Sequence, residues 1–110
     1  MPRYVVLHHL DIPDPHYDLM LDPDGVSPLH TYRVIQWPPT ESDRFTRIDD
    51  HRRIYLDYEG PISGGRGRVI LIVRGIYNCC EETKDSVGNT LIDLDCGPRL
   101  KLPLFTKRSE

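Results

Sequence analysis

The chain has 110 residues, of which 38% are hydrophobic and 28% are charged, and its formal net charge is −3. This length allows a single domain with one core, and the composition is typical of a globular chain rather than a disordered one. No apolar run is longer than segment 69–73, which is far shorter than the ~20 residues that span a membrane. The N-terminus lacks the architecture of a signal peptide, so we expect a cytoplasmic protein without a membrane partner.

Proline and glycine turns divide the chain into short β-branched or aromatic segments. None of these segments carries the apolar stripe of an amphipathic helix. The polar segment 38–50 is predicted as a loop, with at most one helical turn capped by Thr40 or Ser42. The pattern predicts one all-β domain over 1–110, either a barrel or a sandwich. The predicted strands are, in chain order, 4–10, 16–21, 31–37, 53–58, 68–73, 90–94 and 100–105.

The second predicted strand carries candidate metal ligands on one face. Because side chains alternate along a strand, His16 and Asp18 project from the same face roughly 6–7 Å apart, together with Met20. Such nitrogen and oxygen ligands suit manganese, zinc or iron. The preceding strand ends in His8 and His9, which point to opposite faces, so either can complete a three-ligand set with positions open for water or phosphate. The same spacing also fits ordinary surface or hydrogen-bonded histidines.

The segment around the fourth predicted strand offers groups for acid–base chemistry. On strand parity, His51, Arg53 and Tyr55 share one face, opposite Ile54 and the other apolar residues. An imidazole, a guanidinium and a phenol on one face could bind an oxyanion or protonate a leaving oxygen. The alternative is a half-exposed strand with mixed polar residues, which is common.

Glycines and arginines follow. Segment 63–68 reads SGGRGR, in which backbone amides and Arg66 could approach an anion. It lacks the lysine and the helix of a P-loop, and it could equally be a plain hairpin. Seven arginines and no lysine lie between positions 44 and 74, and arginine suits bidentate phosphate contacts. The alternative for this arginine-rich stretch is a solvated, ion-paired surface, and the negative net charge does not itself indicate a nucleic-acid binder.

The three cysteines do not indicate a disulfide framework. Cys79 and Cys80 are adjacent and Cys96 stands apart, an odd count without framework spacing. The spacing also matches no common zinc motif.

Taken together, the sequence HYDLMLD at 16–22, the sequence YLDYEGP at 55–61 and the following GGRG turn resemble the 3'-phosphoesterase domain of bacterial DNA ligase D, in particular its short stand-alone members. The resemblance runs over residues 4–77. It implies a small closed β-barrel of about seven to eight strands with short peripheral helical turns. It also implies manganese-dependent trimming of nucleic-acid 3' ends in DNA repair. In that reaction a terminal ribonucleoside and then the 3'-phosphate are removed, which leaves the 3'-hydroxyl that a separate ligase or polymerase needs.

The resemblance also assigns roles to residues. The metal ligands fall on His9, His16 and Asp18, with Mn²⁺ as the expected ion and Zn²⁺ or Co²⁺ as alternatives. The phosphate-contacting histidine falls on His51, and a supporting tyrosine on Tyr55.

The chain departs from the family's pattern at several points. Met20 stands where larger members carry a phosphate-contacting arginine, a role that Arg53 or Arg66 could take over. A second phosphate-binding arginine of the family corresponds to Arg44 or Arg47. The connection before His16 is one residue longer than usual, which keeps His8 open as a ligand. These departures leave two alternatives: a catalytically weakened module that binds 3' ends and keeps the metal pocket, or an enzyme acting on a small phosphorylated metabolite.

Overall fold

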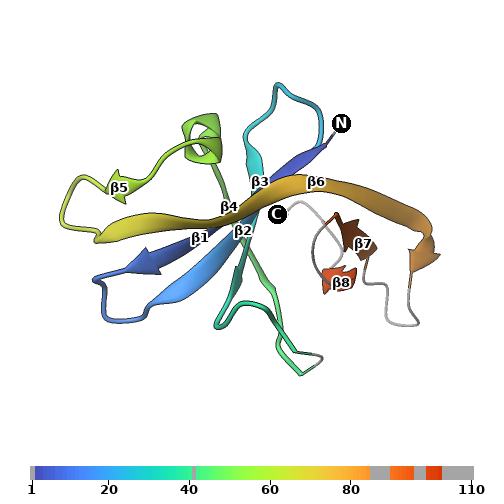
Figure 1. Cartoon of the computed structure of the whole chain (residues 1–110), viewed down its shortest axis with the longest axis horizontal. Helices are drawn as coiled ribbons and strands as arrows, with labels where there is room; N and C mark the ends of the chain where they lie inside the picture. Colours follow the sequence, from blue (N-terminus) through green and yellow to red (C-terminus); the bar gives the residue numbers. More distant parts are fainter. Residues whose placement is uncertain (1, 41, 85–89, 96–98, 103–110) are drawn as a thin grey trace.

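A computed structural model describes residues 2–40, 42–84, 90–95 and 99–102 (Figure 1). Within these residues almost all regular structure is β-strand, and the only helix described is a short 3₁₀ helix, η1. No described helix could cross a membrane. The elements are β1 (Arg3–Leu10), β2 (His16–Asp22), β3 (Leu29–Val34), β4 (Thr46–His51), η1 (Arg53–Leu56), β5 (Gly60–Pro61), β6 (Arg68–Lys84), β7 (Thr90–Leu94) and β8 (Arg99–Leu102).

The strands form one antiparallel path in the order β4-β3-β2-β1-β6-β7-β8, and the short β5 pairs with β6. Strand β6 is long and bent, and it runs from the end near β5 to the pair formed by β7 and β8 (Figure 1). The predicted all-β class is therefore confirmed. The expected closed barrel is not shown, because in the described part of the chain the sheet is open: β4 and β8 are its two ends and do not pair with each other.

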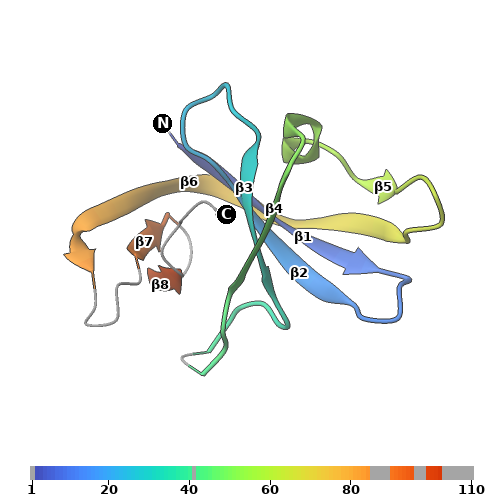
Figure 2. The ribbon, with the colours of Figure 1, turned by 180° about the vertical axis from the view of Figure 1, so that it is seen from behind.

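The larger part of the core lies on the face of β1 and β2 that carries Tyr4, Val6 and Leu19. Strand alternation places these side chains on one side of the sheet, and residues of β7 and β8 pack against them. The η1 helix and the β7–β8 pair lie on opposite sides of the molecule in both views (Figure 1 and Figure 2). The buried members of this cluster are Tyr4, Val6, Leu19, Leu21, Tyr32, Val34, Phe45, Tyr77, Ile92, Leu94, Leu100 and Leu102.

The other face of the same strands carries a smaller core, and this face also carries the candidate site. Its lid is η1, which contributes Leu56, only 4% exposed. Met20 is 1% exposed and lies here as well, as the alternation within β2 predicts. The buried members of this cluster are Val5, Leu7, Met20, Leu29, Leu56 and Val69.

The predicted strand at 53–58 is wrong, because the chain forms η1 there. The backbone N–H groups of Tyr55 and Asp57 donate to the carbonyls three residues earlier, at 3.1 Å each. The alternation expected for a strand also fails, since Leu56 is buried while Ile54 is 58% exposed. The segment leaves the sheet after β4 and crosses its face to cover the smaller core. A short apolar–polar alternation cannot distinguish this path from a strand.

The predicted loop at 38–50 is wrong over its last residues, which form β4. This strand is an edge of the sheet, and its sequence, TRIDDH, is mostly polar. Edge strands often carry charges, which discourage pairing with other chains, and they therefore lack the apolar pattern of inner strands. The Asp43 N–H donates to the Thr40 carbonyl oxygen at 3.1 Å, and neither Thr40 nor Ser42 is assigned to a helix.

The C-terminal strands follow the prediction in part. Strand β6 continues well past the predicted end at 73 and includes the backbone of Cys79 and Cys80, which pairs with that of Ile92 and Leu91. Strand β7 has the predicted bounds. Cys96 and the end of the last predicted strand, 103–105, lie outside the described residues.

Candidate metal centre

Three of the predicted ligands come together at the end of the β1–β2 hairpin that lies next to its turn. His9 and His16 are direct partners in the β1–β2 register, and Asp18 follows on the same face of β2. One ligand atom from each side chain lies within 4.8 Å of those of the other two. His16 and Asp18 are 4% and 3% exposed, so the hydrophobic sheet removes both from water.

One hydrogen bond of His16 determines which of its nitrogens faces this cluster. Its Nδ1 lies 2.8 Å from the carbonyl oxygen of Asp14, and because a carbonyl only accepts, Nδ1 carries the proton. In the neutral ring Nε2 then presents a lone pair, 3.3 Å from Oδ1 of Asp18. Neither of these two buried atoms has a hydrogen-bond partner among the described residues.

Two buried acceptors that face each other are unfavourable unless a positive charge lies between or beside them. A proton on His16 Nε2 or a bound cation would supply that charge. The backbone carbonyl on the far nitrogen of His16 is the partner that metal-binding histidines commonly have, since it orients the ring and raises its basicity. The residues therefore fit a divalent metal ion.

His9 is oriented in the same manner by the glycine-rich turn. Its Nε2 lies 2.7 Å from the Arg66 carbonyl oxygen, which leaves Nδ1 to face the cluster. The turn reaches His9 because residue 67 is glycine: its φ is +78°, and a Cβ there would lie 2.2 Å from the carbonyl oxygen of Leu10. Only glycine allows this close approach.

The choice between His8 and His9 that the sequence leaves open has a geometric answer. His8 lies on the opposite face of β1 and stacks on Tyr17, with ring centroids 4.1 Å apart and planes 9° apart. Only His9 of the two joins the cluster.

A cavity of about 110 Å³ opens beside the cluster and brings in the downstream segments. The Nδ1 of His51 lies 2.9 Å from the Asp49 carbonyl oxygen, which leaves Nε2 available. The ring of Tyr55 meets that of His51 edge to face at 5.8 Å. The cavity is lined by His9, Asp18, Met20, His51, Tyr55, Ile62, Arg66 and Val69.

The electrostatics of the cluster centre on Asp18. Burial raises the pKa of its carboxyl above the ordinary value, and the neighbouring His16, His51, His9 and Arg33 act against that shift. The carboxylate thus lies in an apolar setting with cationic or cationisable neighbours, in which a metal ion would favour its charged form.

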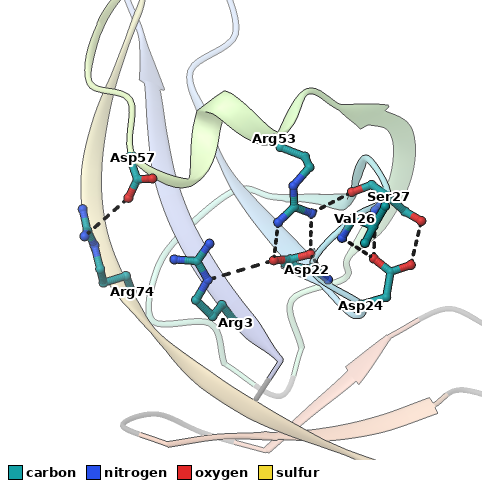
Figure 3. A network of polar contacts seen from close by, with 9 residues as sticks. Arg3, Asp22, Asp24, Val26, Ser27, Arg53, Asp57 and Arg74 are labelled. Carbon is teal, nitrogen blue, oxygen red and sulfur yellow. Dashed lines mark hydrogen bonds and ion pairs between the residues drawn. The ribbon is translucent and has the colours of Figure 1, made fainter.

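Arg53, which the sequence predicts at the site, lies elsewhere. Its guanidinium binds Asp22 with two hydrogen bonds, at 2.6 and 2.8 Å, and donates to the Ser27 carbonyl oxygen at 2.9 Å (Figure 3). Arg3 also approaches Asp22, at 4.0 Å. This network fastens η1 to the connection after β2. Arg53 does not line the cavity, because a helix rather than a strand carries it.

The two upstream arginines are also not brought to the cavity. Arg47 donates to Asp50 at 2.6 Å and to the backbone carbonyl oxygens of Thr31 and Ile48, and its guanidinium lies 5.4 Å from the ring centroid of Tyr32. Arg44 is exposed in the connection before β4.

Arg33 is a residue that the sequence prediction missed. It is the register partner of Asp18 on β3, so the two side chains share a sheet face. It is half-buried, and its Nε has no hydrogen-bond partner in the described part of the chain. Sequence parity places Arg33 in a strand, but the pairing register that sets it against Asp18 is visible only in the fold.

Comparison of the sequence with protein-family models and with curated proteins finds no match.

Proposed function

We propose that the chain is a divalent-metal-dependent phosphoesterase that processes the 3' ends of nucleic acid and leaves a 3'-hydroxyl. The observation that carries this proposal is the pair of buried, unpartnered acceptors, His16 Nε2 and Asp18 Oδ1, set 3.3 Å apart beside His9. The substrate class, nucleic-acid 3' ends, comes from the family resemblance carried by segments 16–22 and 55–61 and the GGRG turn. The proposed site of action is the cytoplasm, with a separate ligase or polymerase taking the product.

His9, His16 and Asp18 would hold the metal, with Mn²⁺ as the proposed ion. When bound, it supplies Lewis-acid charge neutralisation at the phosphate. Three protein ligands are the number that leaves positions open in a catalytic site. The backbone carbonyls of Asp14 and Arg66 hold the two imidazoles in place, so the site is formed before substrate arrives.

His51 is the proposed acid. Its Nδ1 donates to a backbone carbonyl, so in the imidazolium form Nε2 carries the second proton and can donate to a phosphate oxygen or protonate the departing 3' oxygen. Tyr55 packs edge to face on the imidazole and keeps it in the cavity. Arg66 lines the same cavity and adds a positive charge that stabilises the phosphate oxygens.

Arg44 and Arg47 remain candidate phosphate contacts through the resemblance. Because neither lines the cavity, they would contact phosphates of the nucleic acid further from its 3' end.

Arg33 is the proposed replacement for the arginine that this chain lacks at position 20. Its side chain lies beside Asp18 on the same face. Replacing Arg33 by glutamine is expected to lower the rate of 3'-phosphate release about tenfold or more, since one fewer charged donor faces the phosphate. The thermal shift caused by Mn²⁺ should persist, because the three ligands are intact. Arg74→Gln, which removes an exposed arginine paired with Asp57, is the control and should keep the rate. An unchanged rate in Arg33→Gln contradicts this role.

The second candidate function is an end-binding module that keeps the metal pocket and has lost turnover. Met20 favours it, because this side chain is 1% exposed and presents only apolar surface at the floor of the cavity.

Incubation of the wild-type protein with Mn²⁺ and a 3'-phosphorylated oligonucleotide separates the two functions. We expect release of inorganic phosphate that EDTA abolishes, and trimming of a 3'-terminal ribonucleotide under the same conditions. An oligonucleotide phosphorylated only at its 5' end should remain intact. Tight metal-dependent binding of the 3'-phosphorylated end without any product would establish the binding module instead.

A further inference from the structure

A second hollow of about 210 Å³ adjoins the metal cavity. The two share Tyr55, Ile62 and Arg66 as lining residues, so they lie side by side. The second hollow lies between η1 and the glycine-rich turn. It is lined by Arg52, Ile54, Tyr55, Tyr58, Pro61, Ile62, Ser63 and Arg66.

The lining of this hollow is cationic. It contains two arginines and no acid, although two acids lie close by in sequence. Asp57 is turned toward Arg74 on β6, at 3.7 Å (Figure 3). Glu59 accepts the backbone N–H of Leu71, also on β6, at 2.9 Å. Both carboxylates are thus held by a neighbouring strand, and Arg52 has no ion pair in the described part of the chain.

The hollow also offers flat and apolar surface. The rings of Tyr55 and Tyr58 meet edge to face at 5.8 Å and 87°, and the Tyr58 hydroxyl donates to the Pro61 carbonyl oxygen, which fixes its ring. Ile54 is 58% exposed and adds apolar surface here. Aromatic and apolar side chains of this kind, combined with arginines, are what proteins use to hold unpaired bases.

We propose that this hollow holds the base of the nucleoside whose 3'-phosphate lies in the metal cavity. The inference rests on the proposed function: the metal cavity takes the 3'-phosphate, and the second hollow takes the base of the same nucleotide. A volume of about 210 Å³ lies below the ~300 Å³ of typical drug-sized ligand sites, which suits a single ring system. Contacts with ring faces, rather than with base edges, imply little preference among the four bases.

Binding of two oligonucleotides tests this proposal without catalysis. Both are short, single-stranded and 3'-phosphorylated; one ends in thymidine, and the other ends in an abasic tetrahydrofuran nucleoside. Affinities are measured by fluorescence anisotropy in EDTA, which stops turnover. Loss of the terminal base is expected to weaken binding to the wild-type protein about tenfold. Equal affinity for the two oligonucleotides overturns the proposal.

Two variants locate the effect in the hollow. Ile54→Ser changes an exposed side chain and Tyr58→Leu keeps apolar packing while removing the ring. Each should remove most of the discrimination and leave the affinity for the abasic oligonucleotide unchanged. Ile35→Ser is the matched control, because Ile35 is 75% exposed outside both cavities, and it should keep the full difference. Variants that weaken binding of both oligonucleotides equally would overturn the proposal.

This readout is separate from the phosphoesterase assay. Base discrimination without phosphate release under Mn²⁺ would support the hollow and reject the enzyme. Phosphate release without base discrimination would support the enzyme and reject the hollow.

Discussion

Replacing His16 by alanine is expected to abolish Mn²⁺-dependent release of 3'-phosphate, with a loss of at least about hundredfold. Loss of residues that only orient metal ligands already costs about 10–100-fold in metal affinity or activity, and His16 is proposed as a ligand itself. The measurement is the initial rate of phosphate release from a 3'-phosphorylated oligonucleotide at saturating Mn²⁺.

The same variant should lose the stabilisation that Mn²⁺ gives. A ligand that binds only the folded state stabilises it by about 2.7 kcal/mol at a hundred times its Kd. The wild-type protein should therefore melt at a higher temperature with Mn²⁺ than with EDTA, and His16→Ala should show no such difference. This second readout does not depend on catalysis.

His8→Ala is the matched control. His8 adjoins His9 in sequence and is likewise half-buried, but it stacks on Tyr17 on the opposite face of the sheet. Its removal should preserve both the rate and the Mn²⁺ shift, apart from a small loss of stability. Equal losses in His8→Ala and His16→Ala would show that the histidines act through folding, and a preserved Mn²⁺ shift in His16→Ala would reject the metal site.

The parts of the fold that the sequence predicts correctly depend on local periodicity. In β2 the alternation separates His16, Asp18 and Met20 from Tyr17 and the apolar stripe, and the structure has them on opposite faces. This works because the strand is inside the sheet and covered on both sides, so each side chain has one environment that suits it.

The errors occur where the environment is set by distant contacts. The segment holding Arg53 and Leu56 has the alternation of a strand, but it forms η1 outside the sheet. Two contacts stabilise it there: Leu56 packs in the smaller core, and Arg53 binds Asp22, which is 31 residues away in sequence. Strand β4 was predicted as a loop because an edge strand buries little apolar surface and therefore lacks the apolar alternation that indicates a strand.

The sequence predicts which kinds of side chain form the candidate site, but it predicts only some of the individual residues that join it. His9 is distinguished from His8 by its register with His16, and Arg33 reaches the site through its register with Asp18. Register between strands depends on loop geometry and on packing of the whole sheet, which no local pattern contains. The resemblance points to His9 without any knowledge of the register, because the family's motifs place His9, His16 and Asp18 together as ligands.

Replacing Arg53 by alanine is expected to be the most destabilising single change outside the two cores, lowering the melting temperature by about 5–10 °C. Asp22 is 3% exposed, and the variant would leave this buried carboxylate without the two hydrogen bonds that Arg53 donates (Figure 3). Arg3 and the Gly25 N–H remain near this carboxylate, but removing one partner of a buried ion pair costs more than the intact pair contributes. Arg52→Ala, at the neighbouring exposed position, should change the melting temperature little. Similar losses in the two variants would contradict the role of the pair.

The pH dependence of this pair has a definite sign. The hydrogen bonds from Arg53 are the largest cause that lowers the pKa of Asp22 below its ordinary 3.8. A carboxyl with a lowered pKa in the folded state stabilises the fold fully above its unfolded pKa, and that stabilisation disappears as pH falls through the folded value. The gap in melting temperature between the wild type and Asp22→Asn should therefore be constant near neutral pH, should begin to narrow below about 3.8, and should close as the pH falls through the lower folded pKa. A gap that persists unchanged in acid would mean that the side chain stabilises the fold through its shape, and that the ion pair with Arg53 does not hold η1 over the site.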